Sequence, residues 1–158
     1  MDAGEILLNQ ELLDSDQLLQ LREKDVEGVA LVDAAVTLGF VKEEEALRAL
    51  ASESGLEFVD LRDTEVDLSL LENFPTRLIH REMLFPLSQD NGTLVVATSN
   101  PFDLYPIDEA GAATGLSVVP VLAARREIDL LVKKHLGVGS ETIDNLIEQR
   151  SDVDEVRS

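Results

Sequence analysis

The N-terminal third of this chain carries one apolar pattern twice, at a constant offset along the sequence. The first copy starts at Gly4 and the second starts at Val32. A supersecondary unit that repeats in this way predicts two similar helical pieces that bury their apolar faces against each other. The corresponding apolar positions are Leu7 with Ala35, Leu8 with Val36, Leu12 with Phe40, Leu13 with Val41 and Leu19 with Leu47.

Helical periodicity predicts four helices in the segment that contains the repeat. Asp14, with Gln17 three residues later, forms an aspartate-led capping box that marks the start of the second helix. In that helix we expect Leu18, Leu19 and Leu21 to face the interior. The expected helices span residues 5–10, 14–25, 30–38 and 42–54, with Gly39 and Gly55 supplying the left-handed residue after the last two.

The periodicity changes after Gly55, where alternating apolar residues predict strands. Asn91-Gly92 lies between two apolar runs and predicts a tight antiparallel hairpin, because both residues tolerate positive φ. Val95 and Val96 point to opposite faces of the next strand, so we expect a sheet that is covered on both sides. The expected strands are 84–88, 93–98 and 116–122, and the expected helices are 104–113 and 124–136. Before them we expect a short strand within 55–61 and helical turns at 67–73 and 75–80.

These patterns together predict an α+β fold. Residues 1–54 are expected to form a four-helix subdomain built on the tandem repeat. Residues 55–136 are expected to form a small α/β subdomain with a three-stranded, partly antiparallel sheet. Residues 137–158 are expected to be a hinge and a linker or disordered tail, because their start is rich in glycine and their end lacks a core pattern. Within this last stretch, residues 141–150 have the spacing of a small amphipathic helix.

The chain is strongly acidic, with 32 acidic against 13 basic residues and a formal net charge of −19. Nucleic acids and anionic membranes are bound by clustered Lys and Arg, so this charge argues against both partners. Two interpretations stay open, a solvated acidic surface or a surface for a basic protein partner. The chain has no Cys, and it has no apolar run of the roughly 20 residues that span a bilayer. Its N-terminus also lacks the basic start of a signal peptide. We therefore expect a cytoplasmic protein without direct membrane insertion.

The sequence contains no recognisable catalytic constellation. It lacks the Gly-x-x-x-x-Gly-Lys-[Ser/Thr] loop that cradles nucleotide phosphates, so we expect no ATP hydrolysis by this chain alone. His80 and His135 stand apart from each other without metal-ligand spacing. The acidic run at 43–45 is typical of the exposed start of a helix and not of a catalytic carboxylate pair. We therefore expect no catalytic residues, no metal and no cofactor.

Further short motifs follow the repeat in a fixed order. They are Gly55-Leu56-Glu57-Phe58-Val59-Asp60-Leu61, Leu84-Phe85-Pro86-Leu87, Gly92-Thr93-Leu94-Val95-Val96-Ala97, Asn100-Pro101-Phe102-Asp103-Leu104 and Gly115-Leu116. The repeat and this series of motifs together cover about residues 4–136. They resemble the N-terminal domain of the assembly ATPases of type II secretion and type IV pilus systems.

The resemblance implies a non-catalytic module. In that family the domain precedes the ATPase core and docks on the inner-membrane platform of the machine. The resemblance therefore implies a docking and regulatory domain, cytoplasmic and peripheral to the inner membrane through its partner. If the chain is a fragment, the motor domain follows in cis and the full-length protein would be an ATPase. A free-standing adaptor of the same fold is an alternative.

A further alternative is a cyclic di-GMP sensor, because one branch of the family binds that ligand through the tandem motif. Each copy of the motif opens there with Arg-Leu-Gly. In this chain Asp2 stands at the first arginine position and Ala30 at the second, and a dianion needs guanidinium donors. The degenerate ligand-motif positions are Gly4, Leu7, Leu8, Leu12, Leu31, Val36, Gly39 and Phe40, which a competing interpretation assigns to the core of the helical subdomain.

Overall fold

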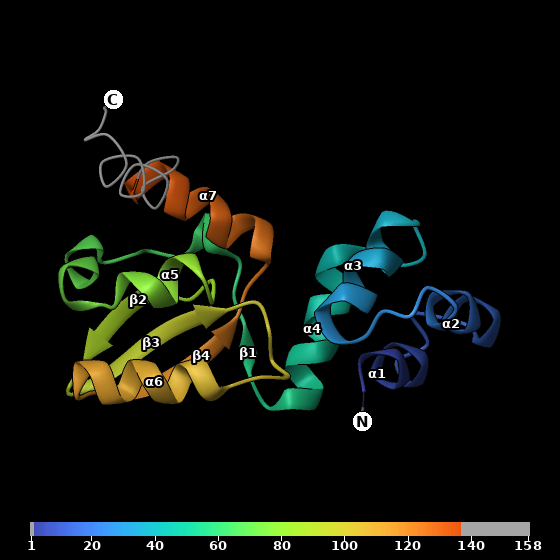
Figure 1. Ribbon diagram of the computed structural model, residues 1–158, viewed down its shortest axis with the longest axis horizontal. Coiled ribbons are helices and arrows are strands. Elements are labelled where there is room, and N and C mark those ends of the chain that lie inside the picture. The colour runs from blue at the N-terminus through green and yellow to red at the C-terminus, as the bar shows by residue number, and fades with distance from the viewer. Residues whose placement is uncertain (1, 137–158) are drawn as a thin grey trace.

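The computed structural model describes residues 2–136 and shows four N-terminal helices beside a mixed sheet (Figure 1). The fold is therefore α+β, as the sequence predicts. The helical part consists of α1 (Ala3–Asn9), α2 (Ser15–Arg22), α3 (Gly28–Thr37) and α4 (Glu43–Ser54). The α/β part consists of β1 (Glu57–Phe58), η1 (Leu61–Asp63), η2 (Leu68–Asn73), α5 (Thr76–His80), β2 (Phe85–Asp90), β3 (Thr93–Thr98), α6 (Tyr105–Thr114), β4 (Ser117–Leu122) and α7 (Arg125–Leu136).

The first two helices begin at reciprocal side-chain caps. The Asp2 carboxylate accepts the Glu5 amide at 2.8 Å, and the Asp14 carboxylate accepts the Gln17 amide at the same distance. The side chains of Glu5 and Gln17 each accept the backbone amide of the capping aspartate in return. These boxes satisfy amides that a short helix would otherwise leave unpaired. The capping box predicted at Asp14 is thus confirmed.

The helices bury one apolar cluster, in which α1 contacts both α3 and α4. The apolar residues of each helix recur at three- and four-residue spacing, so one stripe per helix enters the cluster. Its buried members are Ala3, Ile6, Leu7, Leu13, Leu18, Leu21, Leu31, Val32, Ala35, Val41, Ala46, Leu47, Ala49, Leu50 and Ala51, joined by Leu122 and Ala124.

The sheet has four strands in the order β1-β4-β3-β2. β2 and β3 pair antiparallel, while β3 with β4 and β4 with β1 pair parallel. The hairpin between β2 and β3 turns at Asn91 and Gly92, whose φ values are 51° and 81°. Two successive positive φ values fit the type I′ geometry that an Asn-Gly pair favours, so the predicted hairpin is confirmed.

A second apolar cluster fills the α/β part. In the central strand β3, Val96 is fully buried and Val95 is half-buried, so both faces of the strand are covered to different degrees. α6 approaches β4 closely, because a Cβ on Gly111 would lie 3.7 Å from Val118 Cγ2. α7 contacts β3 and η1.

The end of β4 joins the two parts of the molecule. Leu122 and Ala124 pack with the helices, whereas Val121 and Ala123 belong to the cluster under the sheet. α4 contacts both β1 and β4 and lies next to β1 (Figure 1). Leu122, the last residue of β4, and Ala124 thus complete the core of the helical part. The predicted boundary between two subdomains after residue 54 stays a prediction.

Several details differ from the sequence predictions. The sheet has four strands and not three, because the two-residue β1 adds to β4 in parallel and the Val59 amide extends this pairing to the Leu122 carbonyl oxygen at 2.9 Å. Leu19 does not face inward and is 59% exposed, because Leu18 and Leu21 define the buried face of α2 and Leu19 lies more than about a third of a turn from the middle of that face. The third helix begins at Gly28, two residues earlier than expected. The predictions for residues 137–158 lie outside the described residues.

Candidate functional site

Both copies of the repeat end in the same hydrogen-bonded turn. The Leu12 amide donates to the Leu7 carbonyl oxygen at 2.9 Å, and the Phe40 amide donates to the Ala35 carbonyl oxygen at 2.9 Å. The residue just before each donor is left-handed, with φ 61° in the first copy and 78° in the second. This is the pattern of a helix C-terminus closed by one left-handed residue. Corresponding positions of the repeat therefore have corresponding backbone geometry.

Three of the predicted ligand-motif positions lie inside the helical part. Gly4, Leu7 and Leu31 are all buried. A Cβ at Gly4 would lie 2.6 Å from Leu18 Cδ1, so glycine permits the close approach of α1 to α2. A ligand that contacted Leu7 or Leu31 would first have to open the helical core.

The other predicted ligand-motif positions lie at the edge of the same core. Leu8, Leu12, Val36 and Phe40 are half-buried and pack against the helical cluster. Gly39 is exposed, with no atom within 4 Å of the place that a Cβ would take. The structure thus brings the apolar side chains of this set into one cluster and leaves Gly39 at the surface.

The position that carries arginine in the ligand-binding branch is occupied here by a helix cap. The Asp2 carboxylate accepts the Glu5 amide and lies 3.5 Å from the Arg22 guanidinium. The Glu5 hydrogen bond, followed by the charge of Arg22, lowers the pKa of Asp2. The corresponding position of the second copy, Ala30, is exposed on α3 and offers no donor. The repeat therefore presents a carboxylate and a methyl group where a dianion would need two guanidinium groups.

Charged side chains meet where the helical part adjoins the start of α7. The Arg126 guanidinium lies 2.9 Å from the Glu43 carboxylate, which ties α7 to α4. Burial raises the pKa of Asp33, an effect that Arg125 opposes and Glu43 reinforces. This cluster was not predicted from the sequence, although two adjacent arginines at the predicted start of the last helix were a signal for it. The hollow there has a volume of about 490 Å³ and is lined by Asp33, Glu43, Met83, Arg125, Arg126 and Asp129.

A buried carboxylate fastens η1 to α7. Glu127 is 6% exposed and accepts the Leu61 amide at 3.1 Å. Its second oxygen lies 3.4 Å from Arg62 Nε, and Arg62 also pairs with Asp60 at 2.6 Å. The hydrogen bonds from Arg62 lower the pKa of Asp60 to about 2. Because Glu127 is fully engaged by its neighbours, this group is a structural clamp.

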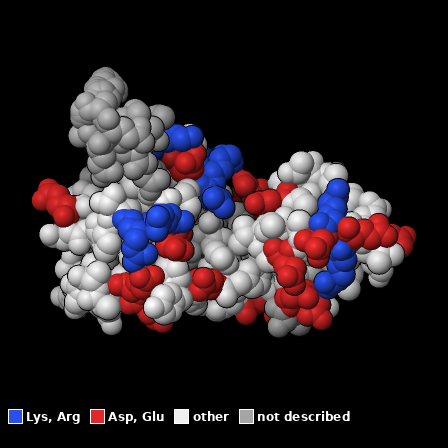
Figure 2. Space-filling view, viewed as in Figure 1, with Lys and Arg blue, Asp and Glu red and all other residues white. Residues whose placement is uncertain are grey.

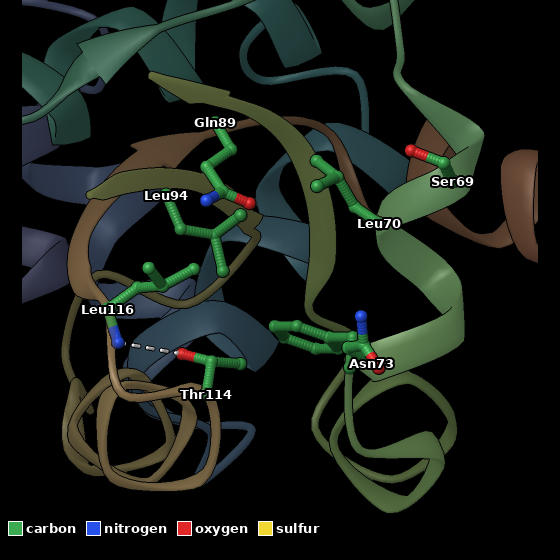
Figure 3. Close-up of a pocket in the computed structure, with 8 residues that line it drawn as sticks. Ser69, Leu70, Asn73, Gln89, Leu94, Thr114 and Leu116 are labelled. Atoms are coloured by element: carbon green, nitrogen blue, oxygen red, sulfur yellow. Dashed lines mark hydrogen bonds between the residues drawn. The ribbon is translucent and has the colours of Figure 1, made fainter. Parts of the chain in front are cut away.

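The α/β part also has a cavity of about 360 Å³ between η2, the β2–β3 hairpin and the end of α6 (Figure 3). Leu70, Leu94 and Leu116 point into it from different elements. Asn73 and Gln89 add amide groups, and the Leu116 amide donates to Thr114 Oγ1 at 3.3 Å. None of the described residues that line this cavity is ionisable. It offers an apolar floor with neutral polar groups and no means of acid–base chemistry.

Within residues 2–136, no group of three or more His, Asp or Glu side chains is arranged to hold a metal ion. None of the helices within these residues is long and apolar enough to cross a bilayer. His80 Nε2 is buried without a hydrogen-bond partner in the described part of the chain. The structure thus offers surfaces and small hollows as candidate sites.

The helices and the mixed sheet together define a class of domain, and comparison with known families gives that class its name. The chain belongs to the MshEN domain family, the N-terminal domain of type II secretion and type IV pilus ATPases. The family matches residues 54–142, which is more than half of the chain.

Two curated relatives agree with this assignment. The chain is 30% identical over 149 residues to the type II secretion system protein E of Xanthomonas campestris pv. campestris, covering 91% of this chain and 26% of that protein. It is 21% identical over 154 residues to the type IV pilus assembly ATPase PilB of Myxococcus xanthus, covering 97% of this chain and 27% of that protein. The chain thus spans about a quarter of the length of these relatives.

Solved structures show the same fold. MshE with cdg, the abbreviation for cyclic di-GMP, superposes with a TM-score of 0.71 at 22% identity, covering 84% of this chain and 97% of that one. The N-terminal domain of XpsE superposes with a TM-score of 0.63 at 28% identity, covering 84% of this chain and 92% of that one. The mixed sheet with its N-terminal helices is therefore a fold that these proteins share.

Proposed function

We propose that this chain is the non-catalytic docking and regulatory N-terminal module of a type II secretion or type IV pilus assembly ATPase. In this proposal it stays in the cytoplasm and binds the cytoplasmic part of an inner-membrane platform protein. The observation that carries the proposal is membership of the MshEN family, supported by likeness to the N-terminal domain of XpsE. A motor domain in cis would supply ATP hydrolysis, for which this chain has no phosphate loop.

The surface charge supports a basic protein as the partner. Asp and Glu are spread over both parts of the visible face, while Lys and Arg form fewer, separate groups (Figure 2). With a net charge of −19, long-range attraction would raise the rate at which a basic partner associates. The same field opposes nucleic acid and anionic lipid.

Titration with the cytoplasmic domain of the cognate platform protein tests this function. We expect saturable binding that weakens with added salt, because charges separated by more than roughly 8–10 Å are screened near physiological ionic strength. A folded protein of similar size and negative charge serves as the control for simple ion pairing. Absence of binding at both low and high salt would refute docking. An affinity that does not change with salt concentration would support docking and would show that electrostatic attraction does not drive it.

The likeness to MshE with cdg raises cyclic di-GMP as a second candidate ligand. We propose instead that the repeat serves here as packing, because Leu7 and Leu31 are buried and Asp2 caps a helix. A charge-assisted hydrogen bond contributes roughly 1.5–3 kcal/mol, so the loss of two should weaken binding about a hundredfold or more.

Calorimetry with cyclic di-GMP tests this interpretation. The unaltered chain should show no heat of binding at micromolar ligand. The double variant Asp2→Arg/Ala30→Arg should bind measurably if the apolar frame of the motif is intact. Saturable micromolar binding by the unaltered chain would show that the repeat is a ligand site after all.

The sequence downstream of this chain separates the module of a larger ATPase from a free-standing adaptor. A reading frame that continues into a phosphate-binding loop would establish the first. The purified chain should release phosphate from ATP no faster than a mock preparation under either alternative.

A further inference from the structure

The connection between β3 and α6, together with the first residue of α6, exposes three large apolar side chains within four positions. Phe102 is 40% exposed, Leu104 is 36% exposed and Tyr105 is 68% exposed. Tyr105 is the only tyrosine of the chain. We name these three residues the loop patch. Aromatic residues are enriched at the centres of protein interfaces, so their exposure in one connection calls for a function.

The loop patch differs from the other exposed apolar residues of the described chain in being concentrated. Each of the others lies singly in its own element, and single exposed apolar residues are normal. Only the β3–α6 connection and the start of α6 bring several together among residues 2–136. The single ones are Leu19, Leu38, Leu68, Val119 and Leu130.

Hydrogen bonds hold the loop patch in one conformation. The Asn100 side chain accepts the Phe102 amide at 2.9 Å, and the Asp103 side chain accepts the Tyr105 amide at 3.1 Å. The prolines on either side of the exposed stretch, at positions 101 and 106, are buried. A preorganised loop loses little conformational entropy on binding, so little of the binding free energy from the apolar contacts is spent on ordering the loop.

The loop patch lies at the border of the two parts of the molecule. A Cβ at Gly28, the first residue of α3, would lie 3.8 Å from Phe102 Cδ2. The connection reaches from the sheet toward the helical part (Figure 1). A partner seated on the loop patch would therefore contact the helical part and the α/β part at once.

Carboxylates lie along the chain beside the loop patch. Glu27 precedes Gly28, Asp103 lies within the loop, and Asp108 follows one turn into α6. All three are exposed, and none of them forms an ion pair with another described residue. Their charge is thus left for a partner to neutralise.

We infer that the loop patch is the docking surface for a segment of a partner protein that combines apolar side chains with Lys or Arg. The apolar residues would contact the loop patch and the basic ones would meet the flanking carboxylates. A second copy of this chain is a poor occupant, because each copy carries a net charge of −19. This inference rests on the proposed function, in that it locates the surface that a platform protein would use.

The test is titration of the full chain with the cytoplasmic domain of the cognate platform protein, as the unaltered chain and as Phe102→Ser/Tyr105→Ser. Truncating a hot-spot residue at the centre of an interface costs about 2 kcal/mol or more, so we expect binding to weaken by about thirtyfold or more if the loop patch is such a centre. Leu19→Ser and Leu130→Ser are the matched controls, because these side chains are 59% and 57% exposed elsewhere on the molecule. They should change affinity less than about twofold.

The single variant Tyr105→Ser guards against misfolding, because this side chain is the most exposed of the three. It should reproduce most of the loss while the circular dichroism spectrum stays unchanged. If the unaltered chain binds and the patch variants bind equally well, docking stands and the loop patch is refuted as its surface. If the unaltered chain does not bind, the proposed function fails with it. Concentration-dependent dimerisation that Tyr105→Ser abolishes would assign the loop patch to a second copy and overturn the inference.

Discussion

The two copies of the repeat follow the same backbone path with different residues. Each closes its first helix with the same 2.9 Å hydrogen bond, yet the left-handed position is Glu11 in the first copy and Gly39 in the second. Glutamate accepts this conformation at a steric cost that glycine avoids. Burial of the flanking apolar residues therefore maintains the turn even where the favourable residue is missing.

The surroundings of the two copies also differ. Leu47 in α4 is 7% exposed, whereas the corresponding Leu19 in α2 is 59% exposed. α4 contacts the sheet through β1 and β4, while α2 contacts α1 and α3. The first copy, which we call the outer copy, has a side-chain cap at the start of both of its helices, α1 and α2. The second copy, the inner copy, has no side-chain cap at α3 or α4. A repeat thus specifies local geometry, and its neighbours decide which side chains are buried.

The largest expected effect distinguishes a core position from a surface position within the outer copy. Leu7 has no exposed area, so Leu7→Ala should lower the free energy of unfolding by about 2–5 kcal/mol. Leu19→Ala, in the same copy, should change it by about 0.5 kcal/mol or less. Urea denaturation followed by circular dichroism measures both. Equal effects of the two substitutions would mean that the outer copy is not packed as described.

The next effect tests the left-handed position in each copy. Gly39→Ala should destabilise by about 1 kcal/mol or more, because alanine is strained at φ 78°. Glu11→Gly should stabilise by a few tenths of a kcal/mol or more, because it relieves the same strain in the first copy. Opposite signs in the denaturation midpoints are the expected result. A loss of stability in both variants would show that the Glu11 side chain contributes more than its backbone strain costs.

Caps provide a third and smaller contrast. Asp14→Ala removes the acceptor of the Gln17 amide and should cost about 1 kcal/mol. Lys42 occupies the corresponding position before α4 but makes no side-chain cap hydrogen bond. Lys42→Ala should therefore leave the unfolding temperature nearly unchanged. If the two substitutions cost the same, α2 does not depend on its cap.

The smallest effect concerns the titration of the cap of α1, because α3 in the second copy has no side-chain cap. The Glu5 hydrogen bond and Arg22 hold the pKa of Asp2 below its ordinary value of 3.8. The stability that this ionised carboxylate contributes is complete above pH 3.8 and is lost as the pH falls through the lowered value. Asp2→Asn keeps an acceptor for the amide but does not titrate, so its stability should fall less steeply below pH 4. Because half of the Asp2 side chain is exposed, the difference is small. Identical slopes from pH 5 to pH 3 would contradict the assignment.

Local rules explain why much of the fold was predictable from the sequence. Asn91-Gly92 forces a tight turn wherever it occurs between strands, and Asp14 with Gln17 caps a helix through neighbours three residues apart. A short strand within 55–61 was predicted and is present as β1, but two residues carry too little periodicity to reveal its pairing with β4 far along the chain. Leu19 was wrongly predicted to face inward, because the helical spacing that groups Leu18 with Leu21 on one face of α2 places Leu19 off that face.

The candidate sites were less predictable because they depend on distant contacts. Burial of Leu7 and Leu31 agrees with the interpretation of the repeat as a core, while its ligand-binding alternative rested on family resemblance. Tyr105 is the first residue of α6, and its exposure depends on which elements pack around that helix, while the Arg126–Glu43 pair joins residues that are 83 positions apart. Neither feature has a signature in residue spacing.

The sharing of β4 between two cores has a consequence for synthesis of the protein. The helices are translated first, yet Leu122 and Ala124, which complete their core, leave the ribosome last among its members. Until then the apolar face of α4, which contacts β4, lacks part of its cover, and a nascent chain in that state is open to chaperones and to aggregation. Such long-range closure slows folding, because the intervening chain must be ordered before the contact can form. The helical part of this protein is thus first to be made and among the last to be finished.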